Sequence, residues 1–335
     1  MQAAIYGLAG LQLAADERDF FRDADPAGFI IFARNCSNRE QLRALTDELR
    51  SLSGRADVPI LIDQEGGRVA RMKPPEWTAF PPMGVFDKLY DIAPSSAIEA
   101  ARVNARALAL MLVECGINVD CLPVLDVLQP GASDIVGDRS LGSVPMQVSA
   151  LGRAVLDGMA SAGVLGTLKH IPGHGRALVD SHKELPLVSA LEEELAIDLE
   201  PFERLSSRCP MAMVAHIVYS VWDPLHPASQ SQVVIRDIIR GRIGFDGWLM
   251  TDDLGMEALA GSPGERAERC LAAGCDVALH CSGRLDEMID VAGRVGAMTP
   301  RSAERLEQAM AAIAPEEGLD FAAALDKRDR LLALV

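Results

Sequence analysis

Eight short apolar runs that alternate with helical segments constrain the fold of this chain more than any other feature. The runs begin at residues 3, 28, 58, 117, 164, 211, 247 and 275. Between them lie segments with helical spacing and many Ala, Leu, Glu and Arg residues, such as 39–52, 96–115, 146–162 and 263–273. Because strands buried on both faces of a parallel sheet read as near-continuous apolar runs, the alternation predicts parallel β/α units.

The number of these units predicts an α/β fold built as a single (β/α)8 TIM-type barrel, with a doubly wound open sheet as the alternative. No Ser-, Gly- or Pro-rich linker divides the chain of 335 residues. We therefore expect residues 1–335 to form one domain. The part from about residue 301 reads as mostly helical, and we expect it to pack on the outside of the barrel.

Composition disfavours several classes of partner. The formal net charge is −16 and aromatic residues make up only 4%, which argues against nucleic acid or an anionic membrane as partner. Seven scattered cysteines form no C-x-x-C pair, and the N-terminus lacks the basic segment of a signal peptide. We therefore expect reduced thiols and a cytoplasmic location. No run of about 18 uninterrupted apolar residues, the length of a membrane span, occurs in the sequence.

Polar side chains recur at the ends of the apolar runs. They stand at or just after the last residue of a predicted strand, at Asp63, Asp126, Lys169, His170, His216, Asp252 and Asp253. In a parallel barrel this edge carries the active site. Charged groups at the ends of buried strands are costly unless they are paired or used. The pattern predicts one shared catalytic cleft.

The stretch "KHIPGHGRALVDSH", residues 169–182, allows more than one chemistry. His170 and His174 have the spacing of metal ligands on a helix, but the Pro-Gly pair between them disfavours a helix, so we expect no metal. Lys169 could trap a carbonyl as a Schiff base, or it could hydrogen-bond a substrate hydroxyl, and the residues leave both possibilities open.

The same stretch and a later one offer groups for proton transfer and nucleophilic attack. Asp180 and His182 are two residues apart, and a carboxylate beside an imidazole forms a general acid/base pair. Asp252 or Asp253 could act as a nucleophile or stabilise a cationic centre. Because neighbours on a strand face opposite ways, we expect only one acid in the cleft and the other capping a helix that begins near Leu254.

Two further loops carry charged residues. "LIDQEGGRVAR" at 61–71 places two acids and two arginines around a Gly-Gly turn, at Asp63, Glu65, Arg68 and Arg71. It lacks both glycine-rich phosphate motifs and fits recognition of sugar hydroxyls or of an acidic ligand group. In "GDRSLG" at 137–142, Arg139 either joins such a site or forms a local salt bridge with Asp138.

Five elements in this order resemble glycoside hydrolase family 3, and within it the single-domain β-N-acetylhexosaminidases of bacterial cell-wall recycling. They are "IDQEGGRV", "GDRSLG", "KHIPGHG", "VDSH" and "TDDLGM", and they span residues 62–256. The resemblance implies a retaining exo-β-N-acetylglucosaminidase that needs no metal or other cofactor. Its expected substrates are small carbohydrates, either muropeptide fragments in which N-acetylglucosamine is β-linked to 1,6-anhydro-N-acetylmuramic acid carrying a peptide, or chitobiose-like sugars.

The resemblance also assigns roles to single residues. It implies that Asp252 is the nucleophile, that His182 is the general acid/base and that Asp180 is the partner of His182. The residues implied to hold the N-acetylglucosamine ring are Asp63, Arg71, Arg139, Lys169 and His170. Those implied to belong to the mobile loop that carries His182 are Gly173, His174 and Gly175. His216 matches no motif.

Other activities remain as alternatives. A β-glucosidase of the same family typically draws acid/base residues from additional domains, which this chain does not suggest. An N-acetylglucosaminide phosphorylase would use the same nucleophile and histidine. A non-catalytic sugar-binding barrel would be expected to lack Asp252 or His182, and both are present. A lyase using Lys169 would be revealed by borohydride trapping.

Overall fold

The computed structural model describes residues 1–335 and contains one eight-stranded parallel sheet. Each predicted apolar run supplies one strand, which confirms the expected strands. They are β1 (Gln2–Gly7), β2 (Pro26–Ile31), β3 (Ile60–Ile62), β4 (Val119–Asp120), β5 (Leu168–Ile171), β7 (Met211–Val214), β9 (Trp248–Asp253) and β10 (Val277–His280). Their order in the sheet is β4-β3-β2-β1-β10-β9-β7-β5.

The two ends of this order, β4 and β5, are joined beyond the regular strands. Parallel bridges pair Val119 with Leu165 and Val124 with Lys169. The Leu125 amide donates to the Lys169 carbonyl at 2.7 Å. The sheet therefore closes on itself as a barrel requires, which confirms the α/β (β/α)8 TIM-type barrel and argues against the open sheet.

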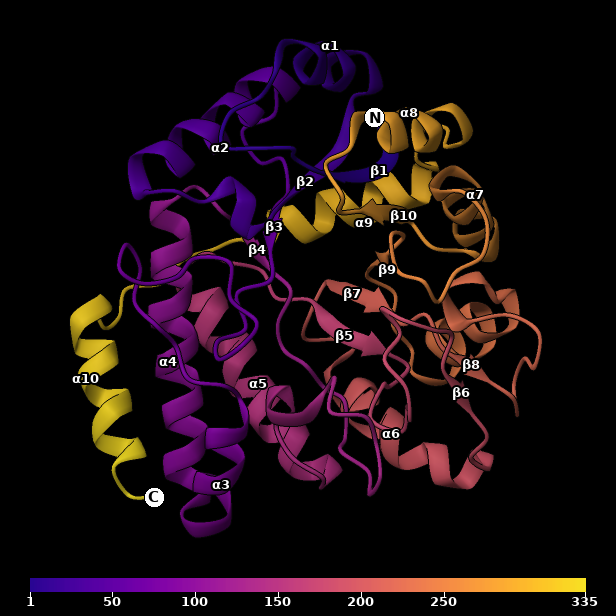
Figure 1. Ribbon diagram of the computed structural model, residues 1–335. Helices are drawn as coiled ribbons and strands as arrows, with labels where there is room; N and C mark the ends of the chain where they lie inside the picture. Colours follow the sequence, from indigo (N-terminus) through magenta and orange to yellow (C-terminus); the bar gives the residue numbers. More distant parts are fainter.

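Helices alternate with the strands and surround the sheet (Figure 1). They are α1 (Ala15–Ala24), α2 (Arg39–Ser53), α3 (Gly84–Ile92), α4 (Pro94–Glu114), α5 (Pro145–Ser161), α6 (Glu192–Leu205), α7 (Pro263–Ala273), α8 (Leu285–Arg294), α9 (Pro300–Ala311) and α10 (Phe321–Leu332). The four predicted helical segments correspond to α2, α4, α5 and α7. None of the helices combines the length and the apolar composition that crossing a bilayer would require.

Local sequence signals explain where these helices begin and end. The side chain of Asn38 accepts a hydrogen bond from the Gln41 amide and caps the N-terminus of α2, and Gly54, with φ of 66°, caps its C-terminus. Ser262 caps the N-terminus of α7 in the same way, and Gly274, with φ of 116°, caps its C-terminus. Glycine is favoured at the C-terminal ends of both helices, because the left-handed backbone conformation strains residues that have a Cβ atom.

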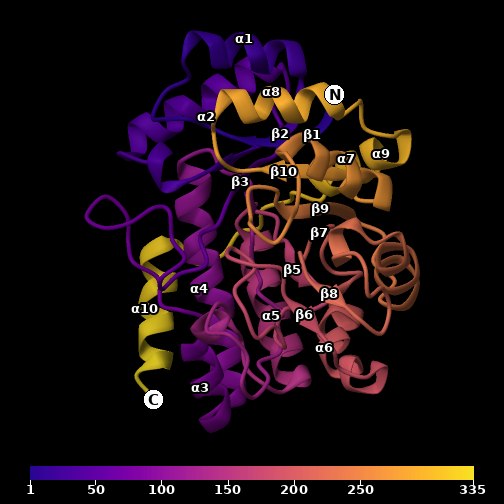
Figure 2. The ribbon, with the colours of Figure 1, turned by 45° about the vertical axis from the view of Figure 1, so that its right-hand side comes forward.

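The part of the chain from residue 301 onward is mostly helical, as expected. Its last helix, α10, lies alongside α4 in two views (Figures 1 and 2). Arg328 of α10 donates to the Asn104 amide oxygen of α4 at 3.3 Å. One apolar core includes both Ala4 of β1 and Ala324 of α10. This continuity favours a single domain over residues 1–335, which stays a prediction.

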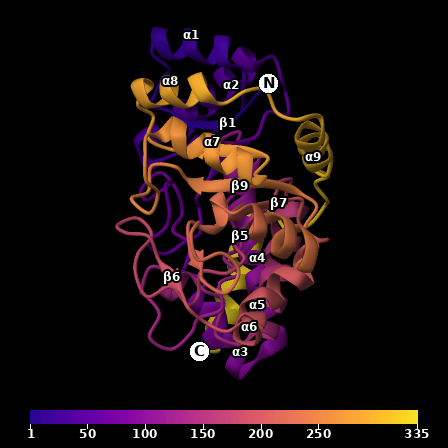
Figure 3. The same ribbon diagram turned by 90° about the vertical axis from the view of Figure 1, so that its right-hand side faces the viewer.

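A second parallel sheet lies outside the barrel and was not predicted. It pairs β6 (Leu187–Val188) with β8 (Val218–Tyr219), and two-residue strands leave no periodic signal in a sequence. Figure 3 shows the loops around β6 on one side of the barrel and α9 on the opposite side. Because β6 follows the C-terminal end of β5, this is the side on which the strands end.

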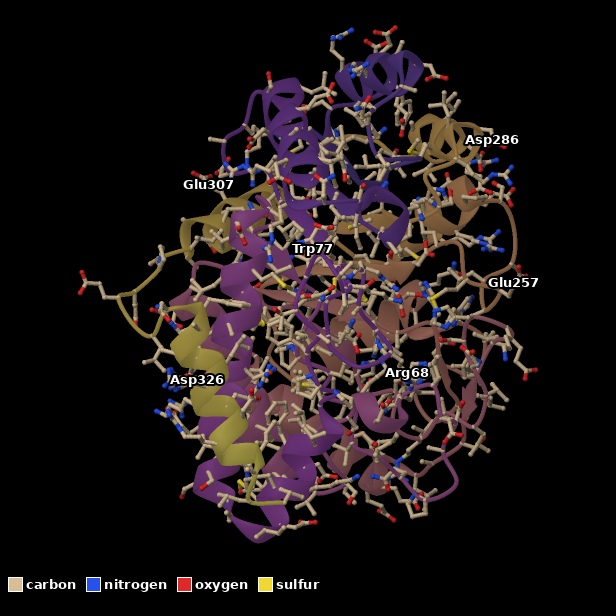
Figure 4. All side chains as sticks on the ribbon, turned by 60° about the vertical axis from the view of Figure 1, so that its left-hand side comes forward. Arg68, Trp77, Glu257, Asp286, Glu307 and Asp326 are labelled. Carbon is tan, nitrogen blue, oxygen red and sulfur yellow. The ribbon has the colours of Figure 1, made fainter.

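Acidic side chains are spread over the outside of the molecule. Glu257, Asp286, Glu307 and Asp326 are all exposed and lie around the periphery in Figure 4. They belong to the excess of acids that gives the chain its formal net charge of −16.

Candidate active site

A cavity of about 290 Å³ lies at the C-terminal ends of the barrel strands, which is the edge that carries the active site in such barrels. Most of the residues predicted for the site line it, namely Asp63, Arg71, Arg139, Lys169, His170, His174, His182 and Asp252. Asp180, Gly173 and Gly175 lie outside its lining. The volume is close to the lower limit of ligand pockets, about 300 Å³, and suits a single sugar ring.

Lys169 of β5 lies at the floor of the cavity between two acids. Its side chain is buried, and Nζ is 2.5 Å from Glu65 Oε1 and 3.1 Å from Asp63 Oδ1. Burial alone would lower the pKa of Lys169, but the two carboxylates outweigh it and raise the pKa above its usual range. A Schiff base forms only from a neutral amine. The structure therefore favours a lysine that hydrogen-bonds substrate over one that traps a carbonyl.

Glu65 joins Lys169 to Arg139. The Arg139 guanidinium donates to both Glu65 oxygens through Nε and Nη2, each at 2.8 Å. Burial opposes ionisation of Glu65, yet the charges of Lys169 and Arg139 lower its pKa from 4.5 to about 2. Sequence reasoning noted Glu65 but gave it no role. The local pair of Arg139 with Asp138 does not form, because Asp138 binds Arg68 at 2.9 Å instead.

Asp63 and Arg71 form the neighbouring ion pair of the cavity. Arg71 Nη2 is 3.0 Å from Asp63 Oδ2, and the guanidinium carbon lies 4.7 Å from the centre of the Phe32 ring. Despite burial, Lys169 and Arg71 hold the pKa of Asp63 well below its usual range. Phe32 also lines the cavity. It was not predicted, because it is one more apolar residue at the end of a strand.

A buried carboxylate, Asp126, orients both histidines of the KHIPGH stretch. Asp126 Oδ2 is 2.7 Å from His170 Nδ1, and Asp126 Oδ1 accepts the backbone N–H of His174 at 2.7 Å. Burial opposes its charge, but the neighbouring His170 holds the pKa of Asp126 below its usual range. With Nδ1 occupied, His170 can present Nε2 to a ligand. Sequence reasoning placed Asp126 at a strand end and assigned it no function.

His174 packs against His170 without forming a metal site. The two ring centres are 5.6 Å apart and the ring planes are inclined at 67°, and His174 Nε2 is 3.2 Å from Ser181 Oγ. Burial lowers the pKa of His174 to about 4, so the ring is neutral at pH 7. Nowhere do three or more His, Cys, Asp or Glu side chains gather as ligands of one metal ion would. The metal reading of this stretch gains no support.

The second predicted pair, Asp180 and His182, lies on the loop after β5. His182 Nδ1 is 2.8 Å from Asp180 Oδ1, and the same oxygen accepts the His182 backbone N–H at 2.9 Å. Partial burial opposes ionisation of Asp180, but these hydrogen bonds keep its pKa below the usual range. The His182 side chain is 60% exposed and lines the cavity. It is therefore held by Asp180 and open to the cavity.

Two glycines shape the chain that leads into this loop. Gly173 has φ of 137°, in the region that favours glycine. At Gly175 an added Cβ atom would lie 1.9 Å from the Val127 carbonyl oxygen, so no larger residue fits without displacing the backbone. Both glycines are required by the path of the chain. The mobility predicted for this loop, which includes His174, stays a prediction.

Asp252 and Asp253 both line the cavity, so the expectation that only one of them faces the cleft is wrong. A register irregularity between β9 and β10 falls at this point, and side chains alternate strictly only in a regular strand. The helix expected near Leu254 is also absent, since the next helix begins at Pro263. Asp253 Oδ1 instead accepts the backbone N–H of Gly255 at 3.0 Å.

The Asp252 carboxylate is ionised in the cavity. Its Oδ1 accepts the Asp253 backbone N–H at 2.8 Å. Desolvation would raise the pKa of Asp252, but the neighbouring His170 and the hydrogen bond from the Asp253 backbone N–H outweigh it and lower the pKa below its ordinary value. A carboxylate beside imidazoles, in a cavity that admits a sugar ring, can attack or stabilise an electron-poor carbon.

The fold and the cavity are those expected of a glycoside hydrolase, because an ionised carboxylate, Asp252, and a histidine held by an aspartate, His182, face one sugar-sized site. The family model described as Glycosyl hydrolase family 3 N terminal domain matches residues 4–314. The chain belongs to glycoside hydrolase family 3, and within it to the β-N-acetylhexosaminidases.

Relatives with known names agree with this placement. A Beta-hexosaminidase from Alkalilimnicola ehrlichii is 41% identical over 283 residues, which cover 82% of this chain and 79% of the relative. A second, from Bordetella avium, is 37% identical over 92% of this chain and 87% of its own length. The crystal structure of NagZ from Neisseria gonorrhoeae in complex with N-trifluoroacetyl-D-glucosamine has a TM-score of 0.86 and 33% identity, and covers 99% of this chain and 98% of that one.

Proposed function

We propose that the chain is a retaining exo-β-N-acetylglucosaminidase that works through a covalent glycosyl-enzyme. A carboxylate oxygen of Asp252 attacks the anomeric carbon while protonated His182 gives its proton to the leaving glycosidic oxygen. In the second step His182 takes a proton from a water molecule, the water oxygen attacks the same carbon, and the bond between that carbon and Asp252 breaks. Two inversions at one carbon retain the β configuration.

The observation that carries this proposal is that Asp252, on a strand, and His182, on a loop, both line the same cavity. Asp252 stands at the end of β9 with its carboxylate ionised, as a nucleophile requires. His182 stands on a loop and is held through Nδ1 by Asp180, so Nε2 is left for proton transfer. Imidazole changes charge near neutral pH and can serve as acid in one step and base in the next.

The other cavity residues suit recognition of an N-acetylated sugar. Lys169, Arg139 and Arg71 offer donors, Asp63 offers acceptors, and His170 offers a ring nitrogen. Charged groups make the strongest hydrogen bonds to hydroxyls. The similarity to a NagZ structure that holds N-trifluoroacetyl-D-glucosamine supports a 2-acylamino sugar in this position.

We further propose that the natural substrates are muropeptide fragments, N-acetylglucosamine β-linked to 1,6-anhydro-N-acetylmuramic acid with its peptide. This rests on the resemblance of the five sequence elements to the cell-wall-recycling branch of the family. We also propose a cytoplasmic location, which is supported by the seven cysteines, all of them unpaired.

The first test compares 4-nitrophenyl N-acetyl-β-glucosaminide with the matching β-glucoside, using protein treated with a chelator. Turnover of the N-acetylated sugar with retained configuration by NMR, and its loss in Asp252→Asn, would support the proposal. Preference for the glucoside would indicate a β-glucosidase, and stimulation by phosphate with formation of a sugar phosphate would indicate a phosphorylase. Full activity of Asp252→Asn would refute the mechanism.

The second test addresses the natural substrate. Purified muropeptide fragments, with and without the peptide, are incubated with the enzyme, and the released N-acetylglucosamine is measured by mass spectrometry. Release from both compounds, at rates above that for chitobiose, would support the proposed substrate class. Hydrolysis of chitobiose alone would contradict it.

A further inference from the structure

A buried histidine next to the cavity has no part in the mechanism described above. His216 follows the end of β7, its side chain is fully buried, and it does not line the cavity. Its Nδ1 is 2.7 Å from Ser229 Oγ, and its Nε2 is 3.1 Å from the Asp253 backbone oxygen. Both ring nitrogens of this buried imidazole are therefore hydrogen-bonded, as is usual for buried polar groups.

The partners fix which nitrogen carries the proton. A backbone carbonyl can only accept, so the hydrogen on the His216 ring must be on Nε2 and point at Asp253. In the neutral ring Nδ1 is then an acceptor, and Ser229 donates its hydroxyl proton to it. Burial lowers the pKa of His216 below its ordinary value, so this neutral tautomer is the form present at pH 7.

Ser229 is itself held in place. It lies in a short 3₁₀ turn, Ala228–Gln230, and is fully buried. The Ala228 amide donates to the Ile217 carbonyl at 2.8 Å, which ties the turn to the residue next to His216. The backbone that carries the Ser229 hydroxyl is therefore held beside His216, where the hydroxyl can orient the imidazole.

The hydrogen bond from His216 Nε2 to the Asp253 carbonyl bears on the position of the proposed nucleophile, Asp252. Asp253 is held at several points. Its carbonyl accepts from His216 Nε2 at 3.1 Å and from the Met256 amide at 3.2 Å. Its Oδ1 accepts the Gly255 and Cys281 amides at 3.0 and 3.1 Å, and its own amide donates to Asp252 Oδ1 at 2.8 Å. Rotation of the Asp253 backbone would move the N–H that aims the Asp252 carboxylate. His216 supplies the side-chain hydrogen bond to the Asp253 carbonyl, beside the backbone hydrogen bond from Met256.

We propose that His216, oriented by Ser229, is a positioning residue that fixes the Asp253 backbone and thereby aims the Asp252 carboxylate at the anomeric carbon. The proposal rests on the proposed role of Asp252 as nucleophile. His216 touches no substrate, so its contribution belongs to the step in which the glycosyl–Asp252 bond forms, and not to binding of the sugar.

Two matched substitutions separate the two ring contacts. In His216→Gln the terminal amide reaches about as far as Nε2 and can still donate to Asp253. In His216→Asn the shorter amide stands in the place of Nδ1 and reaches only Ser229. Ser229→Ala removes the orienting donor and leaves the imidazole in place. Thermal unfolding of each variant measures any loss of stability separately from loss of rate.

The rate of nucleophilic attack is read with a 5-fluoro glycosyl fluoride of N-acetylglucosamine, which labels the attacking carboxylate. The labelled peptide is located by mass spectrometry, and the rate constant for labelling is compared across variants. We expect His216→Asn to label about 10²-fold more slowly, because a misplacement near 1 Å costs this much. His216→Gln should recover most of the rate, Ser229→Ala should lie between them, and KM for the 4-nitrophenyl substrate should not change.

Three results would overturn the proposal in distinguishable ways. Labelling of Asp252 in His216→Asn at the rate of the unmodified enzyme would show that the contact is not needed. Equal losses in His216→Gln and His216→Asn, in proportion to their loss of stability, would show that the histidine only fills the core. A label on a residue other than Asp252 in the unmodified enzyme would refute the proposed nucleophile, and the role of His216 with it.

Discussion

Replacing Glu65 by glutamine tests the electrostatic core of the site. The Glu65 carboxylate is 1% exposed. It lies 2.5 Å from Lys169 Nζ and receives two hydrogen bonds of 2.8 Å from Arg139. Glutamine has nearly the same shape, so Glu65→Gln removes the negative charge without opening a cavity. Arg139 then loses its carboxylate partner, and Lys169 loses one of its two.

Two estimates of the cost agree. The fall in the pKa of Glu65 from 4.5 to about 2 corresponds to roughly 3 kcal/mol of stability at pH 7. Removing one partner of a buried ion pair costs about 3–5 kcal/mol in other proteins. We therefore expect Glu65→Gln to lower the free energy of unfolding by about 3 kcal/mol at pH 7, measured by urea denaturation followed by tryptophan fluorescence.

The loss of stability in Glu65→Gln should depend on pH in a defined direction. The pKa of Glu65 is lower in the folded than in the unfolded protein, so its contribution is complete above pH 4.5 and is lost as the pH falls towards 2. The difference in the free energy of unfolding between the unmodified protein and Glu65→Gln should therefore shrink to about half at pH 3. A variant destabilised by poor packing would show no such change.

Glu307→Gln is the matched control. Glu307 lies exposed on α9 and at the periphery in Figure 4, and surface changes of this kind stay within about 0.5 kcal/mol. If Glu65→Gln also stayed within about 1 kcal/mol of the unmodified protein at pH 7, the reasoning from buried charge would be refuted.

Further expectations concern the loop that carries the proposed acid/base. His182→Ala should lower kcat/KM by about 10²-fold or more for a poor leaving group such as a sugar, and much less for 4-nitrophenol, which needs little protonation. Asp180→Asn should show the same dependence on the leaving group with a smaller loss; an equal loss for both leaving groups would contradict an acid role. Gly175→Ala would place a Cβ atom 1.9 Å from the Val127 carbonyl oxygen and should cost about 1–3 kcal/mol in thermal unfolding, together with activity. Gly10→Ala, which meets no atom within 4 Å, should change neither.

The barrel was predictable because its strands are buried on both faces and so appear as apolar runs such as "GFIIFARN" and "VPILIDQEGG". The expected alternation of side chains along a strand failed at the end of β9. There the alternation of Asp252 and Asp253 is broken by an irregular register with the neighbouring strand. Register between strands is a property of two segments at once, and one segment of sequence does not contain it.

The site was predictable where a residue stands at a strand end or within a recognisable element, as Lys169 and His182 do. The partners of these residues were not. Glu65 pairs with Lys169 from 104 positions away along the chain, and Asp126 pairs with His170 from 44 positions away. Such pairs depend on closure of the barrel, which brings the ends of different strands together.

The contrast between the acidic exterior and the cavity has a consequence for the speed of encounter. The formal charge is −16, whereas four acids and four Lys or Arg side chains line the cavity, namely Asp63, Glu65, Asp252, Asp253, Arg68, Arg71, Arg139 and Lys169. A muropeptide, the proposed substrate, would carry carboxylates of its own and would approach through a field of like sign, which salt screens within about 8 Å at physiological ionic strength. Added salt should therefore raise the association rate of an anionic fragment and leave that of an uncharged glycoside unchanged. The ionic strength would then set the relative rates at which the two kinds of substrate bind.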